Sequence, residues 1–201
     1  MKEAEVSLRV ALHYILEEKT DQNVMVSLDG AHIKTGAQMH FDVPLFLSEL
    51  GWVKVDGAAD SWQGTYAADG IRPRLTVCSQ PGVGDVTLQL KDGRQLRVEC
   101  KKGTAGNKSG SEYPLMREAI GQLMTGCELT DKIIPAVAVP YTERSMALAS
   151  KWSAYSQIKA IGLQFLLVHE NGGIVCVEHL CTAHDHRETP MRRLPVMHFI
   201  L

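Results

Sequence analysis

Two carboxylates and a lysine stand at the open end of a predicted hairpin, residues 84–103, GDVTLQLKDGRQLRVECKKG. Asp85 opens this segment, and Glu99 and Lys101 close it. A three-residue turn at 91–93 keeps the apolar side chains on one face and sets Asp85 opposite Glu99. A two-residue turn would put the two carboxylates on different faces. We favour the longer turn because its register keeps the apolar face apolar. Opposed residues have β-carbons about 5 Å apart, so both carboxylates can bind one hard cation.

An aspartate followed by Glu-x-Lys on a strand resembles the metal-binding signature of the PD-(D/E)XK, or restriction-endonuclease-like, nuclease superfamily. Here the signature reads Asp85 and Glu99-Cys100-Lys101, and Val83-Gly84 precede the aspartate where that family often has proline. The resemblance implies that Asp85, Glu99 and the Cys100 carbonyl hold Mg²⁺ or Mn²⁺. Lys101 is then expected to orient or deprotonate the attacking water.

The segments after the hairpin follow the order of elements in that superfamily's core. Residues 103–112 are rich in glycine and serine and predict a loop, and residues 114–126 predict a helix that begins at Pro114 and ends at Gly126. The apolar run 133–139 predicts a strand buried on both faces, 143–161 a helix, and 163–168 with 174–177 a second hairpin. The expected fold is α/β, a restriction-endonuclease-like sandwich in which helices flank a central mixed sheet.

A chain of 201 residues with 45% apolar content can bury one sizeable core. We expect a single nuclease-like domain with a helical and strand elaboration at 1–70, the core at 71–180 and a tail at 181–201. Residues 4–18 predict a helix, 23–28 a strand, 29–30 a turn, 42–51 a short helix, 52–55 a strand and 56–70 a loop near the site. Many members of the superfamily add a helix-borne glutamate to the metal site, for which Glu5, Glu17 and Glu49 are unranked candidates.

Gln122 lies on the predicted 114–126 helix and matches the glutamine of the RecB-like and lambda-exonuclease-like branches. Their motif is Gln-hydrophobic-x-x-Tyr, whereas Gly126 occupies the tyrosine position here. Despite this departure, the match of Gln122 itself implies that it contacts a phosphate or a water. The net charge of -2 restricts nucleic-acid contact to a local patch, for which Lys102, Lys108 and Arg117 are the candidates.

These features predict a metal-dependent deoxyribonuclease of restriction, phage defence, recombination or repair. A catalytically inactive subunit of the same fold, which binds DNA or assembles a larger complex, is the alternative. A nuclease that cuts both strands needs two sites, so we expect a homodimer through the apolar residues 195–201, unless these form a last strand on their own sheet. A targeting partner encoded in the same operon is a further expectation.

The C-terminal run CVEHLCTAHDH offers zinc as a rival chemistry through its cysteines and histidines, at positions 176, 179, 181, 184 and 186. The spacing is unlike that of paired zinc ligands, and no second pair follows. The five cysteines are odd in number and form no disulfide-like framework, which favours a reducing cytoplasm. The sequence has no apolar run of about 18 residues, so we expect no membrane span.

Overall fold

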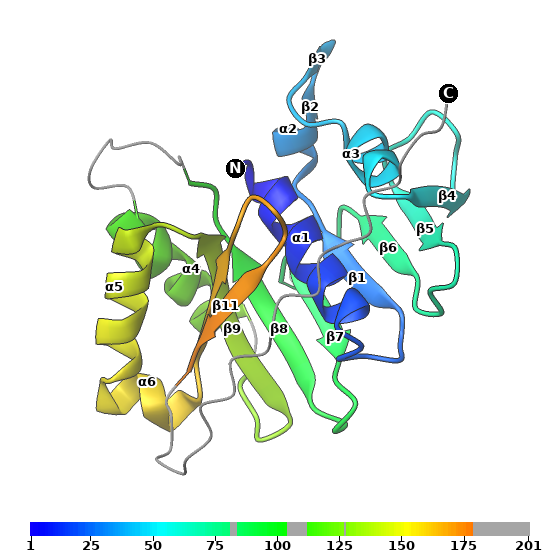
Figure 1. Cartoon of the computed structure of the whole chain (residues 1–201). Coiled ribbons are helices and arrows are strands. Elements are labelled where there is room, and N and C mark those ends of the chain that lie inside the picture. Colours follow the sequence, from blue (N-terminus) through cyan, green and yellow to red (C-terminus); the bar gives the residue numbers. More distant parts are fainter. Residues whose placement is uncertain (81–83, 104–111, 127, 179–201) are drawn as a thin grey trace.

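A nine-stranded mixed sheet runs through the part of the chain that the structure describes (Figure 1). The computed structural model describes residues 1–80, 84–103, 112–126 and 128–178. The strands lie in the order β11-β10-β9-β8-β7-β1-β6-β5-β4, and β2 and β3 form a separate ribbon.

The helices are α1 (Glu3–Leu16), α2 (Gly30–Ile33), α3 (Val43–Glu49), α4 (Glu112–Gly126), α5 (Glu143–Ser153) and α6 (Ser156–Ile161). The strands are β1 (Val24–Ser27), β2 (Lys34–Thr35), β3 (Gln38–Met39), β4 (Trp52–Asp56), β5 (Gly64–Ala68), β6 (Leu75–Cys78), β7 (Val86–Gln89), β8 (Gln95–Cys100), β9 (Ile133–Pro140), β10 (Gln164–Val168) and β11 (Ile174–Val177).

The hairpin of β7 and β8 has the register that the sequence predicts. The strands are antiparallel, and residues 86 and 88 pair with residues 98 and 96. Leu90 and Arg94 close the turn, where the Leu90 N–H donates to the Arg94 carbonyl over 2.8 Å. Gly93 has a φ of 88°, a left-handed conformation that side chains disfavour, so this glycine sets the turn at three residues.

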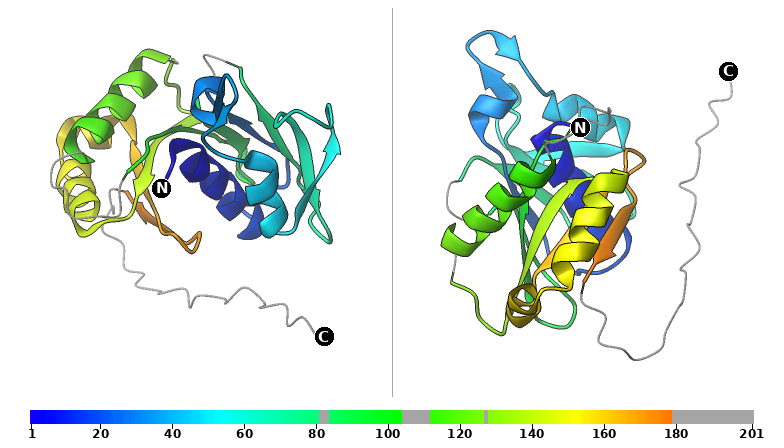
Figure 2. Two further views of the ribbon diagram at one scale, coloured as in Figure 1. Left: turned by 90° about the horizontal axis from the view of Figure 1, so that it is seen from above. Right: turned by 90° about the vertical axis from the view of Figure 1, so that its left-hand side faces the viewer.

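Helices cover both faces of the sheet. Figure 2 shows the sheet curving around α1, with α4 and α5 on its other face. The larger apolar cluster lies under α1 and includes Leu96, Val98 and Cys100 of β8. The smaller cluster lies under α4 and α5 and includes Val137 and Phe165. Side chains of a strand alternate between faces, so residues 97, 99 and 101 point to the α4 side.

Strands β8, β9 and β10 are parallel, so their carboxyl ends lie at one edge of the sheet. Strand β9 contributes to both apolar clusters, as its continuous apolar sequence predicts. Strand β1 pairs with β7 in antiparallel and with β6 in parallel orientation. Residues 1–70 therefore supply α1 and β1 to the middle of the fold, in addition to outer elements.

Three segments differ from the sequence prediction. The stretch 56–70 is not all loop, because residues 64–68 form β5 between β4 and β6, whose backbones provide its hydrogen-bond partners. The predicted turn at 29–30 is the start of α2, capped by the Asp29 carboxylate, which accepts from the Ala31 N–H. The predicted helix 143–161 is two helices, since the Tyr155 N–H donates to the Trp152 carbonyl and Tyr155 is extended.

The chain thus has a mixed α/β fold, with a large central mixed sheet flanked by helices. Helix 114–126 is present and begins two residues earlier, at Glu112. Among the described residues, none of the helices is both long and apolar enough to cross a bilayer. The proposed dimer segment 195–201 lies outside the described residues.

Candidate functional site

The candidate site lies at the open end of the β7–β8 hairpin, where β8 leaves the sheet. Asp85 precedes β7, Glu99 is the penultimate residue of β8, and Lys101 follows that strand directly. The Lys101 N–H donates to the Ala138 carbonyl of β9 over 2.9 Å, which continues the sheet pairing past the end of β8. The backbone at the site is therefore held on both sides by neighbouring strands.

Asp85 binds the backbone on both sides of Glu99. Its N–H donates to the Val98 carbonyl over 3.0 Å, and its Oδ2 accepts from the Cys100 N–H over 2.7 Å. The Asp85 carboxylate thus accepts from an N–H of β8 that lies past Val98, where the pairing of β7 with β8 ends. These two bonds bring Asp85 and Glu99 together, as the predicted register requires.

Lys101 is buried, with 5% of its surface exposed, although a lysine ammonium strongly prefers water. Its Nζ lies 3.7 Å from Glu99 Oε1 and 3.4 Å from Glu118 Oε1. Glu118 belongs to α4 and is half-exposed, so it stands at the solvent side of this group. The lysine therefore joins a strand carboxylate to a helix carboxylate.

Glu3, in the first turn of α1, is a further carboxylate near this group. Its carboxylate is close enough to influence the pKa values of Asp85, Glu99 and Lys101. His32 of α2 flanks it, with Nδ1 3.5 Å from Glu3 Oε1. Neither Glu3 nor His32 was among the residues singled out from the sequence.

Contacts between α1 and the end of β8 place Glu3. The Ser7 hydroxyl is buried one turn after Glu3 and interacts with the Cys100 thiol. The Met1 main-chain nitrogen donates to the Gly103 carbonyl over 2.8 Å, and the Gly103 N–H donates back to Met1 over 3.3 Å. Residues before and after Glu3 are therefore both attached to β8 and its extension.

The three glutamates proposed from the sequence lie elsewhere. Glu5 pairs with Arg9 on the flank of α1, at 2.9 Å from Oε1 to Nη2. Glu17 follows the other end of α1, and Glu49 is the last residue of α3. Glu5 thus lies two residues from Glu3 but is paired with Arg9, whereas Glu17 and Glu49 lie at the ends of α1 and α3.

Burial and nearby carboxylates raise the pKa values of both Asp85 and Glu99. Burial raises the pKa of Asp85 to about 7, with a further contribution from Glu99, against the Cys100 N–H bond that lowers it. Burial likewise raises the pKa of Glu99, although Lys101 opposes that shift. Burial disfavours the Lys101 ammonium, yet the carboxylates around it raise the pKa of Lys101 overall.

The donor set fits a hard divalent cation. Four carboxylates, from residues 3, 85, 99 and 118, are near enough to raise the pKa of Lys101. Oxygen ligands of this kind suit Mg²⁺ or Mn²⁺, and burial, the main cause of the raised pKa values, disfavours the charged form of both carboxylates. Across the described parts of the chain, no three His, Cys, Asp or Glu side chains lie close enough, as they stand, to hold an ion. Binding by Asp85, Glu99 and Glu3 would thus need rotation of their side chains.

The other residues predicted for the site are placed less closely. Gln122 is exposed on α4, one turn beyond Glu118. Lys102 is exposed beside Lys101, and the Arg117 guanidinium lies over the Tyr113 ring at 5.5 Å. Lys108 lies outside the described residues. Contact of these side chains with nucleic acid stays a prediction.

The rival zinc site is also largely outside the described part of the chain. Cys176 is exposed on β11, where its Sγ lies 3.8 Å from Gln164 Oε1. Residues 179–186, which carry the other proposed ligands, are not described. The zinc hypothesis therefore stays untested.

Comparison of this chain with protein-family models, with curated proteins and with solved structures found no match.

Proposed function

We propose that this protein is a metal-dependent nuclease of the PD-(D/E)XK kind that hydrolyses phosphodiester bonds in DNA. The observation that carries the proposal is the group of Asp85, Glu99, Lys101 and Glu3 at one end of a hairpin. Two of its carboxyl groups have raised pKa values, which a bound cation would lower again. A purely structural ion pair has no need of the surplus carboxylates.

Each residue has a separate task in this proposal. Asp85 and Glu99 supply oxygen ligands from the hairpin, and Glu3 adds a ligand from α1. The bond from the Cys100 N–H holds one Asp85 oxygen in place and leaves the other for the cation. The Cys100 carbonyl completes the set that the sequence predicts. A bound Mg²⁺ would supply a Lewis acid that neutralises charge on the phosphate.

Lys101 is better suited to donate than to accept a proton. Its pKa is raised by the surrounding carboxylates, so the metal-free protein carries an ammonium at neutral pH. An ammonium can orient a water through hydrogen bonds and stabilise negative charge that develops on the phosphate. Of the two roles expected from the sequence, orientation of the water is the one that this electrostatic setting favours.

The test is nicking of supercoiled plasmid DNA by the purified protein with Mg²⁺ or Mn²⁺. We expect cleavage that a chelator stops and that Glu99→Gln abolishes, because the variant keeps the shape of the side chain but loses an anionic ligand. Glu128→Gln is the matched control, since Glu128 is exposed and distant in sequence from the site. Calorimetry with both ions should show weakened binding only in Glu99→Gln.

The inactive-subunit alternative predicts a different result in the same assay. Such a protein binds DNA but leaves the plasmid intact with either ion. Unchanged metal affinity in Glu99→Gln would overturn the assignment of the site itself.

A further inference from the structure

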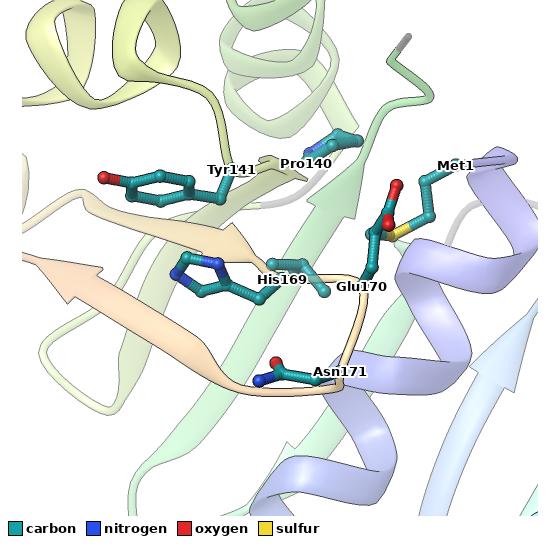
Figure 3. Close-up of a pocket in the computed structure, with 7 residues that line it drawn as sticks. Met1, Pro140, Tyr141, His169, Glu170 and Asn171 are labelled. Atoms are coloured by element: carbon teal, nitrogen blue, oxygen red, sulfur yellow. The ribbon is translucent and has the colours of Figure 1, made fainter. Parts of the chain in front are cut away.

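A pocket of about 430 Å³ opens at the sheet edge where the parallel strands end (Figure 3). Pro140 ends β9 and Val168 ends β10, so the pocket lies at the same edge as the end of β8. Figure 3 shows Tyr141 and His169 on one side of it and Met1 and Glu170 on the opposite side.

Two stacked rings form one wall of the pocket. The Tyr141 and His169 rings have centroids 4.1 Å apart and planes 22° apart. The Tyr141 side chain packs against the apolar cluster under α4 and α5, and both residues of the pair are partly exposed. Backbone bonds hold this wall: the Tyr141 N–H donates to Val168, and the His169 N–H donates to Gly173.

Two hydrogen bonds connect the pocket to the candidate site. They join Met1, a lining residue, to Gly103, two residues after Lys101. A side chain at Gly103 would meet Pro140, because an added β-carbon would lie 3.0 Å from its Cγ. Glycine thus lets the end of β8 approach the pocket. At about 3.3 Å per extended residue, Gly103 lies roughly 7 Å along the chain from Lys101.

The chemistry of the lining selects a flat, uncharged group. A volume of about 430 Å³ falls in the range of small-molecule sites. The aromatic wall offers a surface for stacking, and the Asn171 amide is oriented by the Gly173 N–H, which donates to Oδ1 over 3.0 Å. The Glu170 carboxylate repels phosphate. A nucleobase meets these conditions, and a phosphate does not.

We propose that this pocket binds one unpaired nucleobase of the DNA strand, close to the phosphate that is cleaved. A base can stack on a protein ring only when it has left the base stack of a duplex. The protein therefore acts on DNA with an unpaired nucleotide at the cleavage point, such as a flap, a gap or a single strand. The inference rests on the proposed function for the identity of the polymer, but its test needs no cleavage.

The test is fluorescence anisotropy of a labelled 12-nucleotide single strand and of the matching duplex, in chelator. Stacking of one base on an aromatic ring is worth roughly 5- to 100-fold in affinity. His169→Ala should weaken single-strand binding by about that factor and leave duplex binding unchanged, whereas His169→Phe should keep it. Tyr155→Ala is the control, since Tyr155 is exposed and not a lining residue.

Photo-crosslinking of an iodouracil single strand to the wild-type protein gives a measurement that needs no variant. Adducts on Tyr141 or His169 support the pocket, and adducts confined to other residues overturn it. Equal loss of single-strand and duplex binding in His169→Ala, or no loss, also overturns it. Cleavage of a labelled single strand or flap substrate with Mg²⁺ decides the nuclease proposal separately: ring-dependent binding without cleavage keeps the pocket and removes the nuclease.

Discussion

Asp92 and Asp85 lie at the two ends of one hairpin and have opposite electrostatic settings. At the turn, Asp92 is exposed, and Arg94 donates to its Oδ2 over 2.6 Å, which lowers the pKa of Asp92. At the open end, burial and the nearby Glu99 raise the pKa of Asp85 to about 7. The same type of side chain is thus stabilised in its charged form at the turn and destabilised in its charged form at the open end.

The difference indicates which end of the hairpin serves stability and which serves binding. The Asp92 carboxylate has its counter-charge two residues away and needs nothing further. The Asp85 carboxylate shares Lys101 with three other carboxylates and is buried, so its charged form is disfavoured. A bound cation would favour the charged form of Asp85.

The largest effect is expected from Lys101→Ala. Loss of the ammonium should slow plasmid nicking by about 100-fold or more, because one donor to developing charge contributes that much in other enzymes. Metal affinity should stay nearly unchanged, since the lysine is not a ligand. Lys102→Ala, the exposed neighbour, should lower DNA affinity modestly and its salt slope by about one. A Lys101→Ala protein that cuts at the wild-type rate contradicts the catalytic role.

Glu3→Gln should reduce the stabilisation that Mn²⁺ confers on the folded protein. An ion at 100 times its dissociation constant stabilises the fold by about 2.7 kcal/mol. The variant should lose most of this gain at the same Mn²⁺ concentration, as measured by thermal unfolding with and without chelator. Glu5→Gln, on the same helix but paired with Arg9, should keep it. Equal shifts in both variants would remove Glu3 from the ligand set.

Asp85→Asn should stabilise the metal-free protein at pH 8. Folding raises the pKa of Asp85 from 3.8 to about 7, so its contribution to stability is present below pH 3.8 and is lost as the pH rises toward 7. An asparagine avoids this loss and can still accept from the Cys100 N–H. Denaturant unfolding in chelator should show a gain of about 2 to 4 kcal/mol at pH 8.

The same variant should show little gain at pH 3.5, where the carboxyl group is protonated in the folded state and mostly protonated in the unfolded state. An Asp85→Asn protein that is less stable than wild type at pH 8 would show that the charged form of Asp85 is not disfavoured at the open end.

The smallest effect is expected at the turn. Asp92→Asn removes an exposed ion pair, which contributes little to stability in water. The unfolding midpoint in chelator, the Mn²⁺ affinity and the nicking rate should all match wild type. A loss of metal affinity in this variant would show that the two ends of the hairpin are coupled.

Much of the site could be predicted from the local sequence. The left-handed turn at Gly93 and the alternation of apolar residues on β7 and β8 act over a few residues, so the register and the grouping of Asp85 with Glu99 follow from them. The helix after the hairpin and the buried β9 also have strong local patterns. Strand β5 does not, since its hydrogen-bond partners belong to β4 and β6.

Glu3 illustrates what local patterns leave undecided. Ser7 is a buried polar residue in the apolar stripe of α1, and Glu3 lies one turn before it on that stripe, whereas Glu5 lies on the flank. This signal indicates a helix face but not what the face contacts. The contact of Ser7 with Cys100 and the bonds between Met1 and Gly103 place Glu3 at the site.

The sequence by itself therefore determined the hairpin, its register and the two carboxylates with their lysine, because backbone turns and side-chain alternation are local. Only the tertiary structure decided that Glu3 and Glu118 join them and that an aromatic pocket lies at the same sheet edge. Those groups come from elements far apart in the chain, and packing of α1 and α4 on opposite faces of the sheet sets their positions.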